Sequence, residues 1–288
     1  MQLTSILTDK HLYTPQLRKF AQKTVQLCSS RWMILALIVL GILRGIFLLM
    51  AYPPAHMSDA DLFFLYAERI YGAHNWPLLD QVTYPLYPAL ILVTYKWFGS
   101  AYLLVAVQFV MSVSIAPLYY YALKPYSAVL ATLVALVTLV DFQSGTTFNF
   151  TGAEPLYMLL IALTFTVLMR QTAPEASRNW SVSDSTVGIL LVLMWLTRTI
   201  GRYLILPYGI VFFLYTRSIK RTLTLIAGFV VALLAYMLLS TLVLGDVAGL
   251  NATDYAFTRI MHHHPEWVDA DNGPYTKQWL EYTPGCTS

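Results

Sequence analysis

The sequence predicts an all-α integral membrane protein whose core is made of seven spanning helices. Only 11% of the 288 residues are charged, against about a quarter in a soluble protein, and 57% are hydrophobic. The mean hydropathy is +0.58, and apolar stretches of spanning or near-spanning length recur along the chain. Water could not wet such a surface on all sides, so lipid must solvate much of it.

The seven predicted spans follow in order, judged against the roughly 20 apolar residues that a membrane helix needs. They cover residues 32–52, 101–123, 125–140, 153–169, 186–197, 203–215 and 223–244. The third is short but almost purely aliphatic. The fifth and sixth are shorter still, and the sixth contains Pro207, so a single long broken hairpin is an alternative for this pair.

The chain divides into a cytoplasmic amphipathic lead-in (1–30), the seven-span core (31–244) and an extracytoplasmic tail (245–288). With the N-terminus in the cytoplasm, most Lys and Arg residues fall on the short inner segments, which is the usual bias. The net charge of +3 then reflects these flanks, and nothing favours a nucleic-acid partner. Cys28 and Cys286 lie on opposite sides in this topology, so we expect no disulfide between them.

The first outer loop (53–100) is long and patterned. Residues 61–72 predict an amphipathic helix in the membrane interface, with Ser58 or Asp59 as its N-cap. Tyr84-Pro85-Leu86-Tyr87-Pro88 predicts a turn, because proline fixes its own φ and makes the preceding residue extended. Residues 89–97 predict a second short helix, interfacial or re-entrant, packed on the bundle.

An ordered set of short motifs runs through the chain. It comprises Arg44 near the outer end of the first span, Ser58-Asp59-Ala60 after a Pro-Pro, Tyr-Pro-Leu-Tyr-Pro at 84–88, Thr-Gly-Ala-Glu-Pro-Leu at 151–156 and Leu-Thr-Arg at 196–198. In this order the set resembles the GT-C superfamily of polytopic glycosyltransferases. It is most similar to the branch of the protein O-mannosyltransferases and the aminoarabinose transferase of lipid A. The resemblance covers residues 35–264 and depends on the order of the motifs.

The resemblance implies transfer of a sugar from a polyprenyl- or dolichyl-phosphate carrier to an acceptor on the extracytoplasmic side. An acidic residue of the first outer loop would serve as general base or metal ligand. Asp59 matches that position, and Asp61 matches it if the register shifts by two. The two side chains diverge by about 200° on a helix, so one acts while the other caps. The alternative is a purely structural pair, an N-cap followed by a first-turn charge that favours the helix dipole.

Further charged residues are candidates for the same site. Glu154 begins the fourth span beside Pro155, either as a second carboxylate near the acceptor or a metal, or as an ordinary helix start. Arg198 and Arg202 are four residues apart and suit a donor phosphate, since a guanidinium forms paired hydrogen bonds; the alternative is snorkelling to lipid headgroups. Arg44 lies deeper and is assigned to the donor phosphate too, paired with a carboxylate of the outer loop.

Three consecutive histidines, His262, His263 and His264, follow the seventh span. One of them could bind a divalent metal ion together with carboxylates from elsewhere, because both ligand types suit such ions. The resemblance points the same way, since in the aminoarabinose transferase branch this outer loop reaches back over the cavity. A solvated polar loop is the alternative. A divalent metal ion is the one cofactor that the sequence indicates.

Three functions are therefore compared. The first is a glycosyltransferase whose partners are a polyprenyl- or dolichyl-phosphate-linked sugar and membrane lipid. The second is a non-catalytic GT-C-like membrane subunit of a larger complex, suggested by the chain's ending soon after the seventh span. A transporter is the weakest, because the hydropathy shows no twofold repeat and the ionisable residues gather toward one face.

Overall fold

The computed structural model describes residues 15–52, 85–98, 101–141, 152–171, 180–198 and 200–244. Within these ranges all regular secondary structure is α-helical, and none of it is β-strand. The helices are α2 (Pro15–Ser29), α3 (Trp32–Ala51), α5 (Leu86–Phe98), α6 (Ala101–Leu123), α7 (Ala128–Val140), α9 (Glu154–Gln171), α10 (Trp180–Thr197), α11 (Ile200–Thr216) and α12 (Ile219–Leu244). A helix lies at each of the seven predicted spans, namely α3, α6, α7, α9, α10, α11 and α12.

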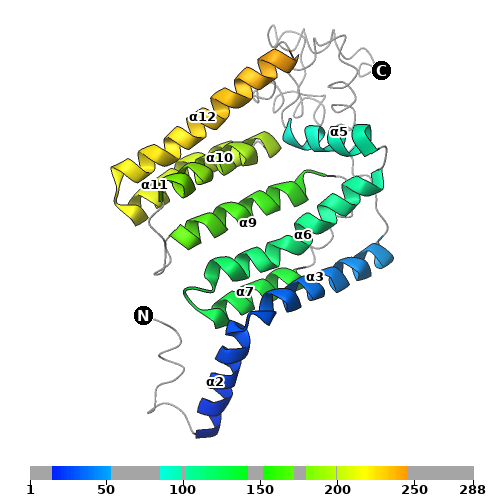
Figure 1. Cartoon of the computed structure of the whole chain (residues 1–288), viewed down its shortest axis with the longest axis vertical. Helices are drawn as coiled ribbons and strands as arrows, with labels where there is room; N and C mark the ends of the chain where they lie inside the picture. The colour runs from blue at the N-terminus through cyan, green and yellow to red at the C-terminus, as the bar shows by residue number, and fades with distance from the viewer. Residues whose placement is uncertain are drawn as a thin grey trace, which may run out of the picture.

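The long helices pack side by side in a row (Figure 1). Contacts join α12 to α10, α10 to α9, α9 to α6, and α6 to both α3 and α7, while α11 packs on α10 and α12. The short helix α5 contacts α6 and α10 at one end of this bundle, and α2 contacts α3 and α7 at the other. We call these the α5 end and the α2 end.

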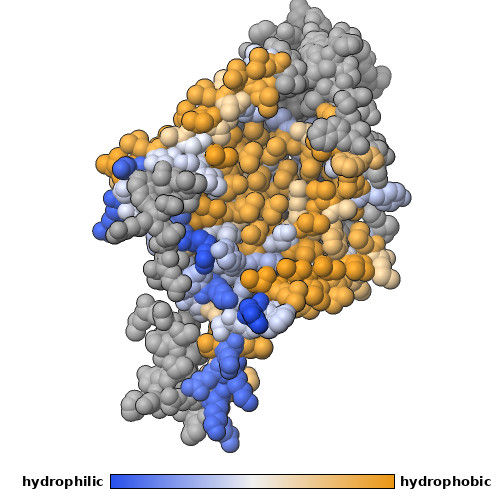
Figure 2. All heavy atoms as spheres, viewed as in Figure 1, coloured by the Kyte–Doolittle hydropathy of each residue, from blue (hydrophilic) through white to orange (hydrophobic). Residues whose placement is uncertain are grey.

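The surface of the bundle is strongly apolar. Three helical stretches have the length and composition to cross a membrane, namely Trp32–Ala51, Tyr102–Leu123 and Ile219–Leu242. Large apolar side chains point outward from them and from α11, among them Met50 (82% exposed) and Leu206 (72%). Figure 2 shows a broad apolar face across the bundle. Such a face marks a surface made for lipid, so the protein has the character of a membrane protein. The count of seven spans stays a prediction.

The backbones of α10 and α12 pack directly against each other, and two glycines make this contact possible. A Cβ on Gly188 would overlap the carbonyl oxygen of Leu225 and lie 2.5 Å from the nitrogen of Phe229. A Cβ on Gly228 would lie 2.7 Å from the Cα of Ser185. Small residues let helix backbones approach in this way, as in many membrane helix pairs.

The predicted start of the fifth span was wrong. We expected a helix from residue 186, but α10 begins at Trp180 and so is more than a turn longer. The polar Ser183 and Asp184 favoured a loop in the sequence. Inside the bundle, however, Asp184 is fully buried and paired with Arg221 of α12, so the helix continues through it.

The remaining differences concern shorter elements. α11 is a continuous helix through Pro207, separated from α10 by a two-residue link, so the pair forms two helices. α5 begins at Leu86, three residues before the predicted start at 89. It can include Pro88 because the first turn of a helix has no internal partners for its N–H groups. The predicted interfacial helix 61–72 lies outside the described residues, and the interfacial placement of α5 stays a prediction.

Candidate functional site

An ion pair joins two helix ends at the α5 end of the bundle. Glu154 is the first residue of α9 and Arg198 directly follows α10. Nη2 of Arg198 donates a hydrogen bond to Oε1 of Glu154. The carboxylate lies at the positive end of one helix dipole and the guanidinium at the negative end of another, so each position is favourable. Both side chains remain about a third exposed, so a ligand can reach them.

Two glycines allow close packing around this pair. A Cβ on Gly152 would overlap a carboxylate oxygen of Glu154, so the glycine in the Thr-Gly-Ala-Glu motif leaves space for that carboxylate. Gly201 follows Arg198 at the start of α11, where a Cβ would lie 2.5 Å from the main chain of Met194. The first turn of α11 therefore packs tightly against the end of α10.

A buried polar group from α6 lies beside the pair. Gln108 is completely buried, and its Nε2 donates to the carbonyl oxygen of Gly152 at 3.0 Å. Its amide also faces the hydroxyl of Tyr87, which belongs to α5 and is itself completely buried. Burial raises the pKa of Tyr87, and the negative charge of Glu154 raises it further. Tyr87 is therefore a neutral hydrogen-bonding group at physiological pH.

These residues bring together three of the motifs that carry the family resemblance. Tyr87 comes from the Tyr-Pro-Leu-Tyr-Pro motif, Gly152 and Glu154 from Thr-Gly-Ala-Glu-Pro-Leu, and Arg198 from Leu-Thr-Arg. We call Tyr87, Gln108, Gly152, Glu154 and Arg198 the motif cluster. Gln108 was missed in the sequence analysis. Its signal was present, since a lone amide in an apolar membrane helix is rare and usually finds a partner inside the bundle.

Arg44 lies at the same end of the bundle but in another contact. Its Nη2 donates to the main-chain carbonyl oxygen of Asp141, the residue that caps α7. We expected a carboxylate of the first outer loop as its partner. The hydrogen-bond acceptor is instead this carbonyl, and the negative charge of the same residue, Asp141, also interacts with the guanidinium. A helix C-terminus offers carbonyl oxygens that have no helical donor, so an arginine on the neighbouring α3 satisfies one of them.

Several predicted site residues fall outside the described part of the chain. They are Asp59, Asp61, His262, His263 and His264. Arg202 lies in the first turn of α11, four residues after Arg198, but its side chain is outside the described part. Within the described ranges, no group of three or more His, Cys, Asp or Glu side chains could hold a metal ion. The metal prediction therefore depends on residues beyond these ranges.

A second charged network, at the α2 end, was not predicted. Nε and Nη2 of Arg221 donate to the two carboxylate oxygens of Asp184 at 2.9 Å each, and Nη2 also donates to Oε1 of Gln171 at 3.2 Å. The network ties α12 to α10 and α9. Asp184 is completely buried whereas Arg221 is partly exposed, and this geometry indicates a structural role.

Comparisons with known proteins add no family assignment: no family model matches the chain, and no curated protein or solved structure matches it either.

Proposed function

We propose that this chain is a membrane glycosyltransferase of the GT-C type, moving a sugar from a polyprenyl- or dolichyl-phosphate donor to an acceptor hydroxyl. The observation that carries the proposal is the motif cluster. Its residues come from segments as far apart as Tyr87 and Arg198, yet they meet at one end of the bundle. Segments that resemble one family in sequence and also share one site in space support a common function.

In this proposal α3, α6, α7, α9, α10, α11 and α12 cross the membrane, with the N-terminus in the cytoplasm and the C-terminus outside. The α5 end then faces the extracytoplasmic side. Basic residues favour cytoplasmic ends, and Arg31, Lys124, Arg170 and Arg217 lie at the α2 end, next to helix termini. Their distribution supports this orientation.

The proposed reaction is a substitution at the anomeric carbon of the donor sugar. Asp59 accepts the proton of the acceptor hydroxyl, whose oxygen forms a bond to that carbon. The bond from the carbon to the phosphate oxygen breaks, and polyprenyl phosphate leaves with the electron pair. Arg198 and Arg202 balance the charge of the leaving phosphate. Nη2 of Arg198 donates a hydrogen bond to Glu154. The guanidinium has further N–H donors, so it can bind a phosphate at the same time.

The first test compares two carboxylates of the first outer loop. Asp59→Asn should lower transfer by about 10²- to 10⁴-fold, the usual effect of losing a general base. Folding should be nearly unchanged, since Asn caps a helix about as well as Asp. Asp61→Asn is the matched control and should matter less. The assay measures product formation from a polyprenyl-phosphate sugar by full-length protein in lipid nanodiscs. Equal transfer by Asp59→Asn and wild type would remove the catalytic assignment, and loss in Asp61→Asn alone would move it to Asp61.

One observation favours the second candidate, a non-catalytic GT-C-like subunit. The charge of Arg198 is already balanced by Glu154, as it would be in a structural pair. Glu154→Gln separates the two functions, because it frees Arg198 while leaving a hydrogen-bonding side chain. In an enzyme this change should alter the KM for the lipid-linked donor. Absence of transfer by wild type with every such donor, together with co-purification of other membrane proteins, would favour the subunit.

A further inference from the structure

The helix α2 is joined directly to a helix that can cross the membrane. It ends at Ser29, and α3, which has the length and composition of a span, begins at Trp32. Hydrogen bonds hold this joint. The N–H of Trp32 donates to Oγ of Ser30 at 3.2 Å, and the hydroxyl of Tyr120 in α6 donates to the carbonyl oxygen of Cys28 at 2.7 Å. The end of α2 is therefore fixed at the level where α3 enters the membrane (Figure 1).

The residues at the joint are typical of the headgroup level of a bilayer. The ring of Trp32 is largely exposed, and Cζ of Arg31 lies 5.5 Å from its centroid. Tryptophan is enriched at this level, and arginine extends its charge to it from the ends of helices. The chain at the joint therefore meets both lipid headgroups and water.

One side of α2 packs on the bundle. Ala21, Thr24 and Val25 are half-buried and Cys28 is buried. Their spacing places them along one side of the helix. Since α2 contacts α7 and α3, this side faces the bundle, and the other sides of α2 remain open.

The adjoining side of α2 combines exposed apolar groups with positive charge. Phe20 and Leu27, nearly two turns apart, are 71% and 66% exposed. Lys23 comes three residues after Phe20 and four before Leu27, so it neighbours both on the helix surface. Lys19 and Lys23 are exposed too, and the sequence contains no Asp or Glu from residue 10 to residue 58. We call Phe20, Leu27, Lys19 and Lys23 the α2 strip.

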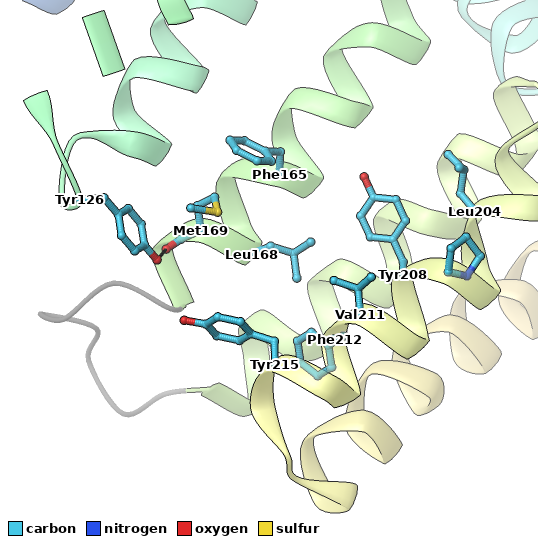
Figure 3. A pocket seen from close by; sticks show the side chains of 10 residues that line it. Tyr126, Phe165, Leu168, Met169, Leu204, Tyr208, Val211, Phe212 and Tyr215 are labelled. Carbon is cyan, nitrogen blue, oxygen red and sulfur yellow. Dashed lines mark hydrogen bonds between the residues drawn. The ribbon is translucent and has the colours of Figure 1, made fainter. Parts of the chain in front are cut away.

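The charge next to the apolar groups distinguishes the α2 strip from the other apolar surfaces. For example, a groove of about 420 Å³ opens between α9 and α11, where Phe165 faces Tyr208 and Val211 (Figure 3). Among the described residues, none that line this groove is charged, so the groove gives no preference for a charged partner. In the α2 strip the lysines lie on the same helix side as the apolar residues. A surface that is apolar inside and negative outside would match both.

A bilayer with anionic headgroups is such a surface, and α2 is already at its level. The helix is too short to cross it, because 15 residues extend about 22 Å and the hydrocarbon core is roughly 30 Å thick. Amphipathic helices with basic side chains lie in the interface, with their apolar residues at the boundary between headgroups and acyl chains.

We propose that α2 lies on the membrane surface and binds anionic phospholipids, with Phe20 and Leu27 inserted between the headgroups and Lys19 and Lys23 at their phosphates. This interaction does not depend on the proposed transfer reaction, and it holds for either orientation of the bundle. It fixes the depth at which α3 enters the membrane.

The first experiment locates α2 by spin labelling of the full-length protein in nanodiscs that contain phosphatidylglycerol. Phe20→Cys or Gln22→Cys carries the label, after Cys28→Ala and Cys286→Ser have removed the native thiols. The two positions are about 200° apart on the helix, and Gln22 is exposed on the polar side. At position 20 the label should collide with oxygen, which concentrates in lipid, more often than with a water-soluble nickel chelate. At position 22 the order should be reversed.

Two results would overturn the proposal. A label at position 20 that is as accessible to nickel as the label at position 22 would place the α2 strip in water. A label at position 20 that neither reagent reaches would show that protein covers the strip, either a second copy of this chain or another protein.

The second experiment needs no label and tests the charge. Amide hydrogen exchange of residues 15–29 should be slower in nanodiscs with phosphatidylglycerol than in phosphatidylcholine alone. Each lysine at an anionic surface strengthens binding about fivefold, so Lys19→Gln/Lys23→Gln should weaken it about 25-fold and remove the difference between the two lipids. Glutamine and lysine have similar helix propensities, so the free helix should exchange as before.

The matched control is Arg217→Gln/Lys220→Gln, which removes the same charge from exposed residues near the same end of the bundle but outside α2. This variant should keep the slower exchange in phosphatidylglycerol. An equal loss in the control would indicate general charge attraction and overturn the proposal. Identical exchange of wild-type α2 in the two lipids would overturn it too.

Discussion

At the scale of single residues, three buried polar side chains, Asp184, Gln108 and Tyr120, have specific partners on other segments of the bundle. Asp184 has no exposed surface and receives two hydrogen bonds from Arg221. Gln108, equally buried, donates to Gly152, and the hydroxyl of Tyr120 donates to the carbonyl oxygen of Cys28 at 2.7 Å. An unpaired polar group would be costly in such surroundings. These bonds therefore fix which helices lie next to one another.

We expect the two ion pairs to respond differently to loss of one partner. Asp184→Ala should lower the free energy of unfolding by about 3 kcal/mol or more, because it leaves the Arg221 guanidinium without its carboxylate in a largely buried position. Glu154→Ala is the matched control. Its pair is about a third exposed, so the expected loss is about 1 kcal/mol or less.

Thermal or denaturant unfolding in one detergent measures both variants. Asp184→Leu combined with Arg221→Met should recover most of the loss, because two apolar side chains leave no buried charge. If the double variant were as unstable as Asp184→Ala, the ion pair would contribute more to the stability of the protein than the neutralisation of two buried charges.

At the scale of helices, the contact between α10 and α12 depends on Gly188 and Gly228. Their backbones approach so closely that a single methyl group on either would meet main-chain atoms of the facing helix. Main-chain atoms cannot rotate away as a side chain can, so the helices would have to separate. The same contact holds Asp184 opposite Arg221, and the network at the α2 end depends on it.

Alanine substitution at two glycines should therefore have opposite effects. Gly188→Ala should destabilise the protein by several kcal/mol, in the range that overpacking or loss of a buried contact produces. Gly209→Ala, in α11, should stabilise it by about 1 kcal/mol, because nothing lies within 4 Å of its Cβ position and alanine is the better helix former. Unfolding midpoints of the two variants measure the difference. Equal midpoints would mean that α10 and α12 lie farther apart than the structure shows.

At the scale of the whole molecule, charge is distributed unequally between the two ends of the bundle. Lys124, Arg170 and Arg217 lie at the α2 end without a carboxylate partner among the described residues, while Arg198 at the α5 end is paired with Glu154. Unbalanced positive charge favours the cytoplasmic side of a membrane. The motif cluster would then lie at the opposite, extracytoplasmic side.

We expect reporters to confirm this orientation. A reporter fused before Met1 should be active only in the cytoplasm, and one fused after Ser288 only outside, because an odd number of spans places the termini on opposite sides. A cytoplasmic signal at Ser288 would contradict both the seven-span count and the orientation. If both signals were reversed, the odd number of spans would stand, but the protein would have the opposite orientation in the membrane.

The positions of the helices could largely be predicted from the sequence. The predicted span 101–123 coincides with α6, and α3, α9, α11 and α12 begin within a few residues of their predicted positions. The reason is that a membrane helix must satisfy its own backbone hydrogen bonds and present apolar side chains over its length. Both requirements are local, so whether a segment can form such a helix depends on its own residues and not on the rest of the chain.

The partners of the polar side chains were decided by the tertiary structure. Glu154 was predicted as a carboxylate near the acceptor or a metal, and Arg198 as a ligand of the donor phosphate. That the two form an ion pair was not predicted. Asp184 was placed in a loop, yet it lies in a helix. Each partner belongs to another helix, and which helices become neighbours depends on how closely their surfaces pack, as at Gly188 and Gly228. The sequence by itself determined where helices form and that lipid surrounds them. The packing of those helices determined which charged side chains form pairs. The 3.6-residue period of a helix fixes the direction in which a side chain points, but it does not fix which neighbouring helix lies in that direction.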